Sequence, residues 1–131
     1  MKLNIFITLI LSMSLSTQAQ NKIAKFRAKE ISISNTTGER TNPSMVDFLV
    51  AFDFSLSRIT FFREKKETYD IIKTLIKDKD EKGDWSIYEC TDENLNEYEI
   101  TFFIPSTQDK VVFSVHKRKS SVKTTIICAY L

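Results

Sequence analysis

The chain has 131 residues, among them two glycines, two prolines, two cysteines and one histidine, and its formal net charge is +2. A nearly neutral chain with interspersed charges lacks the basic excess with which nucleic-acid binders neutralise phosphates, so we expect no nucleic-acid partner. Because Gly38 and Gly83 are the only glycines, glycine-rich loops that hold phosphates or dinucleotides are excluded.

The first nineteen residues have the features of an export signal. Met1 and Lys2 form a short basic start, Leu3 to Leu15 are mostly apolar, and Thr17 and Ala19 place small residues three and one positions before a cut. The apolar run of about 13 residues is shorter than the roughly 20 that cross a bilayer. We therefore expect residues 1–19 to be a removable signal peptide. Residues 20–131 would form one soluble domain, periplasmic or secreted, with no transmembrane segment.

Composition favours strands in the predicted domain. From residue 20 onward, eighteen isoleucines and valines stand against nine leucines and alanines, and β-branched residues suit a pleated, half-buried surface. The clearest strand is Met45 to Phe54, in which Val46, Phe48, Val50, Phe52 and Phe54 alternate with other residues at a period of two.

The same patterns, in chain order, predict eight strands separated by mostly short polar turns. They are Phe26–Ser34, Met45–Phe54, Ser57–Arg63, Thr68–Ile76, Asp84–Thr91, Glu97–Ile104, Lys110–Lys117 and Val122–Leu131. Such short connections suit antiparallel neighbours, and closure would leave no exposed edge. We predict an all-β fold, an antiparallel meander closing into a small barrel. The alternative is an α+β fold with a helix near residues 67–79, where the apolar spacing fits both structures.

The interior of this barrel should be lined by aromatic and branched side chains. The expected lining consists of Phe48, Phe52, Phe54, Ile59, Phe61, Ile100, Phe102, Val111, Phe113 and Val115. About eight strands is near the size at which side chains just fill the space, so the interior is either solid or able to take a small apolar ligand. Phe62, Tyr88 and Phe103 are expected on the outer face, where they could mark a surface for a protein partner.

Two cysteines, Cys90 and Cys128, fall in predicted strands. In an oxidising compartment they could form one disulfide, and two buried free thiols are the alternative. Their spacing matches no Cys/His metal-ligand pattern. Acidic residues near Asp80 alternate with lysines, which argues against a calcium loop, so no metal or cofactor is expected.

His116 is the only histidine and so the only residue that could activate a serine or cysteine nucleophile in the usual way. Ser114 lies two residues earlier on the same strand, but no strained turn presents a nucleophile. We expect an exposed histidine and no catalytic residue.

Four segments carry a resemblance to a known group: residues 26–33, residues 58–61, residues 68–72 and residues 85–92, the last reading Trp-Ser-Ile-Tyr-Glu-Cys-Thr-Asp. With the signal ending at Ala19, they resemble small, uncharacterised exported proteins of Bacteroidota-type bacteria. The resemblance implies no known activity and supplies no catalytic residue.

These observations together predict an exported, non-enzymatic β-domain that acts as a binding module. Its partner would be a small apolar ligand inside the barrel, or a protein or glycan outside it. The alternative is a small hydrolase that uses His116.

Overall fold

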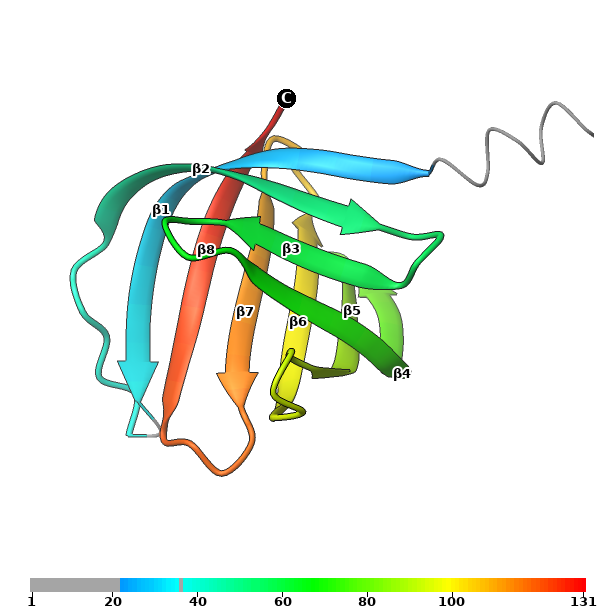
Figure 1. Cartoon of the computed structure of the whole chain (residues 1–131). Coiled ribbons are helices and arrows are strands. Elements are labelled where there is room, and N and C mark those ends of the chain that lie inside the picture. Colours follow the sequence, from blue (N-terminus) through cyan, green and yellow to red (C-terminus); the bar gives the residue numbers. More distant parts are fainter. Residues whose placement is uncertain (1–21, 36) are drawn as a thin grey trace, which may run out of the picture.

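The computed structural model describes residues 22–35 and 37–131, so the predicted signal over residues 1–19 lies outside the described residues. The described chain is all-β and contains no helix, and therefore none that is long and apolar enough to cross a membrane. Its strands are β1 (Ile23–Asn35), β2 (Ser44–Asp53), β3 (Arg58–Phe62), β4 (Glu67–Asp80), β5 (Gly83–Thr91), β6 (Glu97–Pro105), β7 (Val111–Lys117) and β8 (Val122–Tyr130). Consecutive strands pair antiparallel and β1 also pairs with β8, which closes the sheet (Figure 1). The predicted eight-stranded antiparallel barrel is confirmed.

A bulge in β1 helps to bend the sheet. In Figure 1, β2, β3 and β4 run at a steep angle across β5 to β8, and β1 pairs with a strand of each group. Its register shifts between Ala28 and Glu30, and an extra residue in a strand changes which side chains face inward. Phe26 and Ala28 pack into the core before the shift, whereas Ile31 does so after it.

β4 is a strand throughout, so the α+β alternative is wrong. Two bulges lie in this strand, with Ile72 and Leu75 as the extra residues. They move apolar side chains out of strict alternation, so that Ile72, Leu75 and Ile76 show the i, i+3, i+4 spacing typical of a helix. Pairing with β5 along most of its length, and with β3 near its start, makes the segment a strand.

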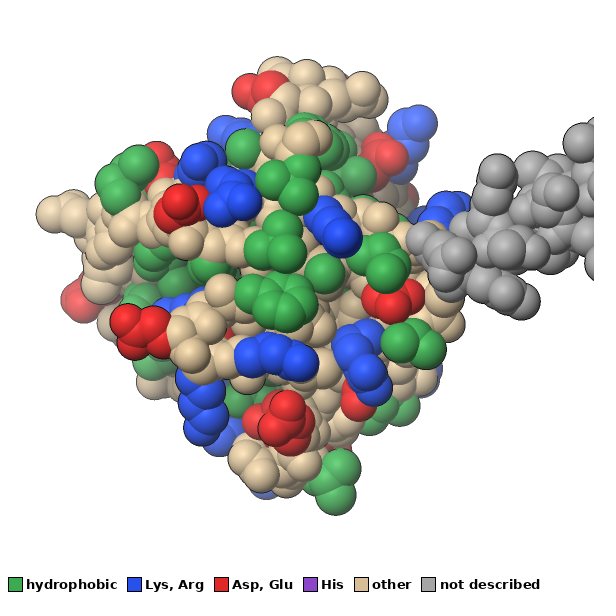
Figure 2. Space-filling model, turned by 45° about the horizontal axis from the view of Figure 1, so that its top comes forward, with side chains coloured by type: hydrophobic (Ala, Val, Ile, Leu, Met, Phe, Trp, Pro, Cys, Tyr) green, Lys and Arg blue, Asp and Glu red, His purple; other side chains and the backbone are tan. Residues whose placement is uncertain are grey.

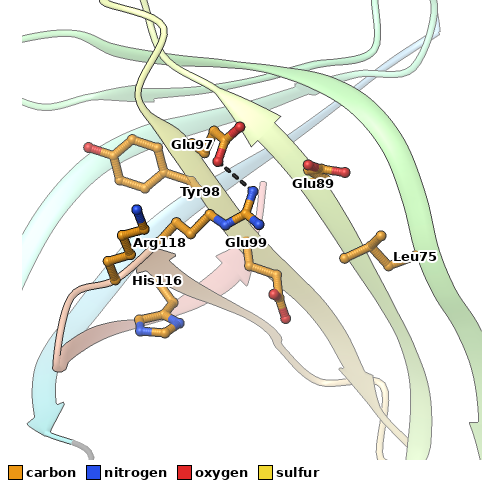
Figure 3. A pocket seen from close by; sticks show the side chains of 8 residues that line it. Leu75, Glu89, Glu97, Tyr98, Glu99, His116 and Arg118 are labelled. Carbon is orange, nitrogen blue, oxygen red and sulfur yellow. Dashed lines mark hydrogen bonds and ion pairs between the residues drawn. The ribbon is translucent and has the colours of Figure 1, made fainter.

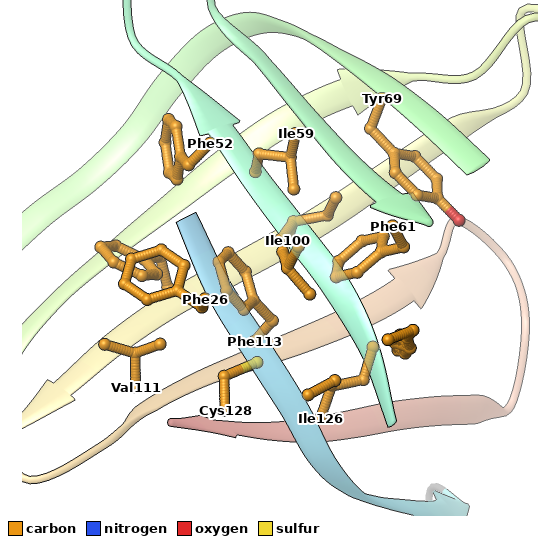
Figure 4. Close-up of a cluster of buried hydrophobic side chains, with 14 of the residues drawn as sticks. Phe26, Phe52, Ile59, Phe61, Tyr69, Ile100, Val111, Phe113, Ile126 and Cys128 are labelled. Carbon is orange, nitrogen blue, oxygen red and sulfur yellow. The ribbon is translucent and has the colours of Figure 1, made fainter. Parts of the chain in front are cut away.

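A continuous row of aromatic rings fills the barrel from one end to the other. Successive ring centroids, 4.3 to 5.7 Å apart, belong to Phe54, Phe52, Phe102, Phe113, Phe61, Tyr69 and Tyr98. Isoleucines and valines such as Ile59, Ile100 and Val111 pack around this row (Figure 4). The middle of the barrel is therefore solid, and room for a ligand has to be sought at its ends.

The structure places five of the six phenylalanines predicted to line the interior in the buried core: Phe48, Phe52, Phe61, Phe102 and Phe113. The expectation for Phe54 is wrong. β2 ends at Asp53, and the Phe54 side chain is 43% exposed while its ring stacks on Phe52 at 4.3 Å.

Tyr88, expected on the outer face, instead lies inward, with its ring 5.7 Å from that of Phe52. It has the same strand parity as the buried Cys90 two residues later, and alternate residues of a strand share a face. Phe62 is exposed as expected, and Phe103 is half-buried.

The two ends of the barrel differ in what covers them. Figure 2 turns the top of Figure 1 forward and shows apolar side chains interspersed with charged ones on that face. The plugged end, toward the upper right of Figure 1, carries the C-terminus and the turns β2–β3, β4–β5 and β6–β7. Two of these turns are joined by a hydrogen bond from the Ser106 amide to the Lys82 carbonyl (2.9 Å), and the rings of Phe26 and Tyr130 pack beneath at 5.8 Å. The open end carries the turns β3–β4, β5–β6 and β7–β8 and the β1–β2 loop.

Candidate functional site

A pocket of about 220 Å³ lies at the open end of the barrel. Strands β3, β4, β6, β7 and β8 and the turns beside them contribute its walls. Its lining residues are Phe61, Arg63, Glu67, Tyr69, Tyr98, Val115, Lys117, Ser120, Val122, Thr124 and Ile126. The volume is below the ~300–1,000 Å³ of sites for drug-sized ligands, so this pocket suits a smaller molecule.

The floor of the pocket is apolar. Phe61 and Ile126 are almost fully buried core residues, and Val115 packs against the same core. Strand alternation explains why these residues meet: each belongs to the inward-facing set of its strand. An apolar group placed here would lose water on contact with already packed side chains, which favours binding.

Two tyrosines form one wall. The rings of Tyr69 in β4 and Tyr98 in β6 meet edge to face, with centroids 4.9 Å apart. The Tyr98 hydroxyl donates a hydrogen bond to the Asp92 carboxylate. Burial raises the pKa of both phenols, most strongly that of Tyr69, so both remain protonated donors near neutral pH.

The Tyr69 hydroxyl is a free donor. The residue is only 5% exposed, yet within the described chain its hydroxyl has no hydrogen-bond partner and is not among the fully buried unsatisfied atoms. Figure 4 shows it pointing away from the core, toward the end of β7. The hydroxyl is therefore accessible from the pocket.

Three charged residues line the pocket. Arg63 forms an ion pair with Glu67 (3.3 Å) and lies over the Phe48 ring, 5.8 Å from its centroid. Lys117 pairs in register with Tyr98 and has no ion-pair partner among the described residues. The pocket thus carries one cation that nothing in the described chain balances.

Further hollows adjoin this pocket. One of about 580 Å³ is lined by Val46, Phe48, Arg63 and neighbouring turn residues, and another of about 210 Å³ lies between the β3–β4 and β5–β6 turns. All three share Glu67. The open end thus has neighbouring hollows around the ion pair of Arg63 with Glu67.

His116 lies outside this pocket, in a separate groove of about 320 Å³ on the outer face (Figure 3). Its Nε2 is 2.8 Å from the Ser120 carbonyl oxygen. Its register partner Glu99 and the ion pair of Arg118 with Glu97 make the groove polar. No hydroxyl or thiol is a described hydrogen-bond partner of the ring. Within the described chain, no group of three or more His, Cys, Asp or Glu residues is arranged to hold a metal ion.

The disulfide considered from the sequence is not formed: Cys90 and Cys128 are both free and buried. Register explains this outcome. Cys90 pairs with Tyr98 near the open end of the barrel. Cys128 pairs with Val111, the first residue of β7, toward the plugged end. The structure therefore corresponds to the alternative of two buried thiols.

Sequence reasoning did not single out Tyr69, Tyr98 or Lys117 as site residues. Lys117 is the last residue of the predicted strand Lys110–Lys117, and its position two residues after Val115 gives it the inward parity of β7. The tyrosines look like ordinary core aromatics until the closure of the barrel brings β4 beside β6 across one end. The one signal in the sequence was strand alternation, which places Tyr69, Tyr98 and Lys117 on the inward-facing side at the ends of their strands.

No protein-family model matches the chain, and neither a curated protein nor a solved structure shows significant similarity to it. What the structure offers toward a function is a closed antiparallel β-barrel with a pocket at its open end.

Proposed function

We propose that this protein is an exported, non-enzymatic binding module that takes a small, largely apolar molecule at the open end of its barrel. The observation that carries the proposal is the pocket itself, where an apolar floor of Phe61, Val115 and Ile126 lies under a polar rim. Concave sites with apolar walls and a few placed polar groups are typical of small-molecule binding. Export by residues 1–19 and the absence of catalysis are parts of the same proposal.

The solid middle of the barrel favours this location. Because the aromatic row occupies the interior, a long lipid chain has no tunnel to enter. A ligand at the open end can instead contact the last part of that row, formed by Phe61, Tyr69 and Tyr98. The pocket volume restricts the ligand to about the size of one ring or one branched aliphatic group with a short substituent.

A pair of variants on one strand tests the site. Val115→Trp would fill the pocket from its floor, whereas Val112→Trp adds the same bulk on the outer face of β7. With 4-methylphenol as the probe in saturation-transfer NMR, we expect binding by the parent protein and by Val112→Trp, and none by Val115→Trp. Circular dichroism melts check that both variants fold. Equal binding by both variants would place the site elsewhere.

The export part has its own test. Protein secreted by its native cells should begin at Gln20, and native mass spectrometry of that material should show a single chain with or without a co-purified small molecule. Recovery of the intact Met1 terminus in a membrane fraction would contradict the export proposal.

A further inference from the structure

Resting on the proposed function, we infer that the ligand of the open-end pocket is a small amphipathic carboxylate, or another molecule with one anionic head and a compact apolar body. The apolar body would lie on Phe61, Val115 and Ile126. The anionic head would accept hydrogen bonds from the Lys117 ammonium and the Tyr69 hydroxyl.

The first argument is charge balance within the lining. Arg63 and Glu67 neutralise each other through their ion pair. Lys117 is left as the unpaired charge of the pocket, although the inward parity of β7 directs it to the mouth. An exposed cation at the mouth of a pocket with apolar walls favours an anion, because hydrogen bonds to ionised groups are stronger than those between neutral groups.

The second argument is the Tyr69 hydroxyl. It belongs to a buried residue, has no described partner and can be reached from the same pocket. Its neighbour Tyr98 already donates to Asp92. Tyr69 is thus a donor held by packing and left available. A carboxylate has two oxygens and could accept from both groups at once.

The third argument concerns selection against other heads. An ammonium head would meet Lys117 at close range and find one carboxylate in the lining of this pocket, Glu67, which is already paired with Arg63. A neutral amide could accept from only one oxygen. We therefore expect the order of affinity to be carboxylate, then amide, then amine.

The test uses three probes that share one body: 3-phenylpropionate, 3-phenylpropionamide and 3-phenylpropylamine. Isothermal titration of the full mature protein should give the tightest binding for the carboxylate, by about 3- to 10-fold over the amide, because the ion pair is partly exposed. The preference should shrink when salt is added.

Three variants locate the effect. Lys117→Met keeps most of the length of the side chain, removes its charge and should abolish the carboxylate preference. Tyr69→Phe should reduce that preference. Lys123→Met removes an exposed charge from the outer face of β8, outside the pocket, and should leave the preference unchanged.

The outcomes separate this inference from the proposed function. Equal affinity for the three probes, lost in Val115→Trp, would overturn the anionic ligand while supporting the pocket. A carboxylate preference that persists in Lys117→Met would overturn the assignment of the head-group site. No binding of any probe would contradict the proposed function together with the inference that rests on it.

Discussion

The two ends of the barrel are built from the same kinds of residue but are packed differently. At the plugged end, Phe26, Phe52, Phe102 and Tyr130 pack against one another, and turns are joined by a backbone hydrogen bond. At the open end, the aromatic row ends in a tyrosine pair beside a recessed surface with charges. The difference shows that a barrel with a solid middle can still have a pocket where one end is left unfilled.

The largest expected effect comes from breaking the plugged end. Phe52 is almost fully buried and contacts Phe54, Tyr88 and Phe102. Phe52→Ala should lower the free energy of unfolding by about 3–5 kcal/mol, through lost burial and a cavity. At the open end, Lys117→Met should change it by less than about 0.5 kcal/mol, as for an exposed residue. Urea melts measure both. Similar losses from the two variants would mean that the ends do not differ in packing.

The glycines give a second contrast between the ends. Gly83, at the plugged end, has φ +146°, and an added Cβ would lie 2.2 Å from the Ile104 carbonyl oxygen. Gly83→Ala should therefore destabilise by roughly 2–4 kcal/mol, from backbone strain and overlap. Gly38, in the β1–β2 loop of the open end, has φ +89° and open space around it, so Gly38→Ala should lose only about 1 kcal/mol. Thermal melts of the pair check the order, and the reverse order would contradict the geometry.

Alkaline pH should destabilise the fold because two buried thiols, Cys90 toward the open end and Cys128 toward the plugged end, resist ionisation in the folded protein. Burial raises the pKa of Cys90 and of Cys128 to about 12, from an ordinary value of 9.0. Between pH 9 and 12 the unfolded chain loses thiol protons that the native chain keeps, so the free energy of unfolding falls as pH rises.

This fall is measured by urea melts between pH 8 and 10.5. The same melts are run on the double variant Cys90→Ala with Cys128→Ala. Its free energy of unfolding should decline less steeply with pH than that of the parent protein. Tyr69 contributes in the same direction, since its pKa is also raised by burial. A decline of equal slope in the double variant would assign the alkaline loss to other groups.

The smallest expected effect is a gain at the open end. Leu95, in the β5–β6 turn, has φ +63° and an exposed side chain, a conformation that a residue with a Cβ adopts at an energetic penalty. Leu95→Gly should raise stability by about 0.5–1 kcal/mol while leaving the pocket, which Leu95 does not line, intact. A loss of stability in calorimetry would show that packing of this leucine outweighs the strain.

The sequence was sufficient for the fold because most of its strands alternate regularly and are joined by polar turns. The period-two pattern of Val46 to Phe52 identified both the strand and its buried face. Prediction from this pattern failed where the backbone departs from regular alternation. The bulges at Ile72 and Leu75 give β4 an apolar spacing that also fits a helix. Because β2 ends at Asp53, Phe54 lies outside the core.

The site was harder to predict than the fold, because it depends on closure. Tyr69, Tyr98 and Lys117 lie on three strands, and only the register that pairs Tyr98 with Lys117 and brings the Tyr69 and Tyr98 rings together makes them one wall. No pattern within a single strand predicts that these three residues come together. The free thiols depend on register in the same way, since Cys90 and Cys128 were candidates for a bridge until the pairings placed them toward opposite ends.

The central claim is that the protein binds small molecules at one end of the barrel, and an NMR titration with 3-phenylpropionate tests it most directly. We predict amide and methyl shift changes at Val115, Lys117, Thr124 and Ile126, with the signals of Phe54 and Tyr130 at the plugged end unchanged. Shift changes centred on the plugged end or on the outer groove around His116, or none with millimolar probe, would contradict the account.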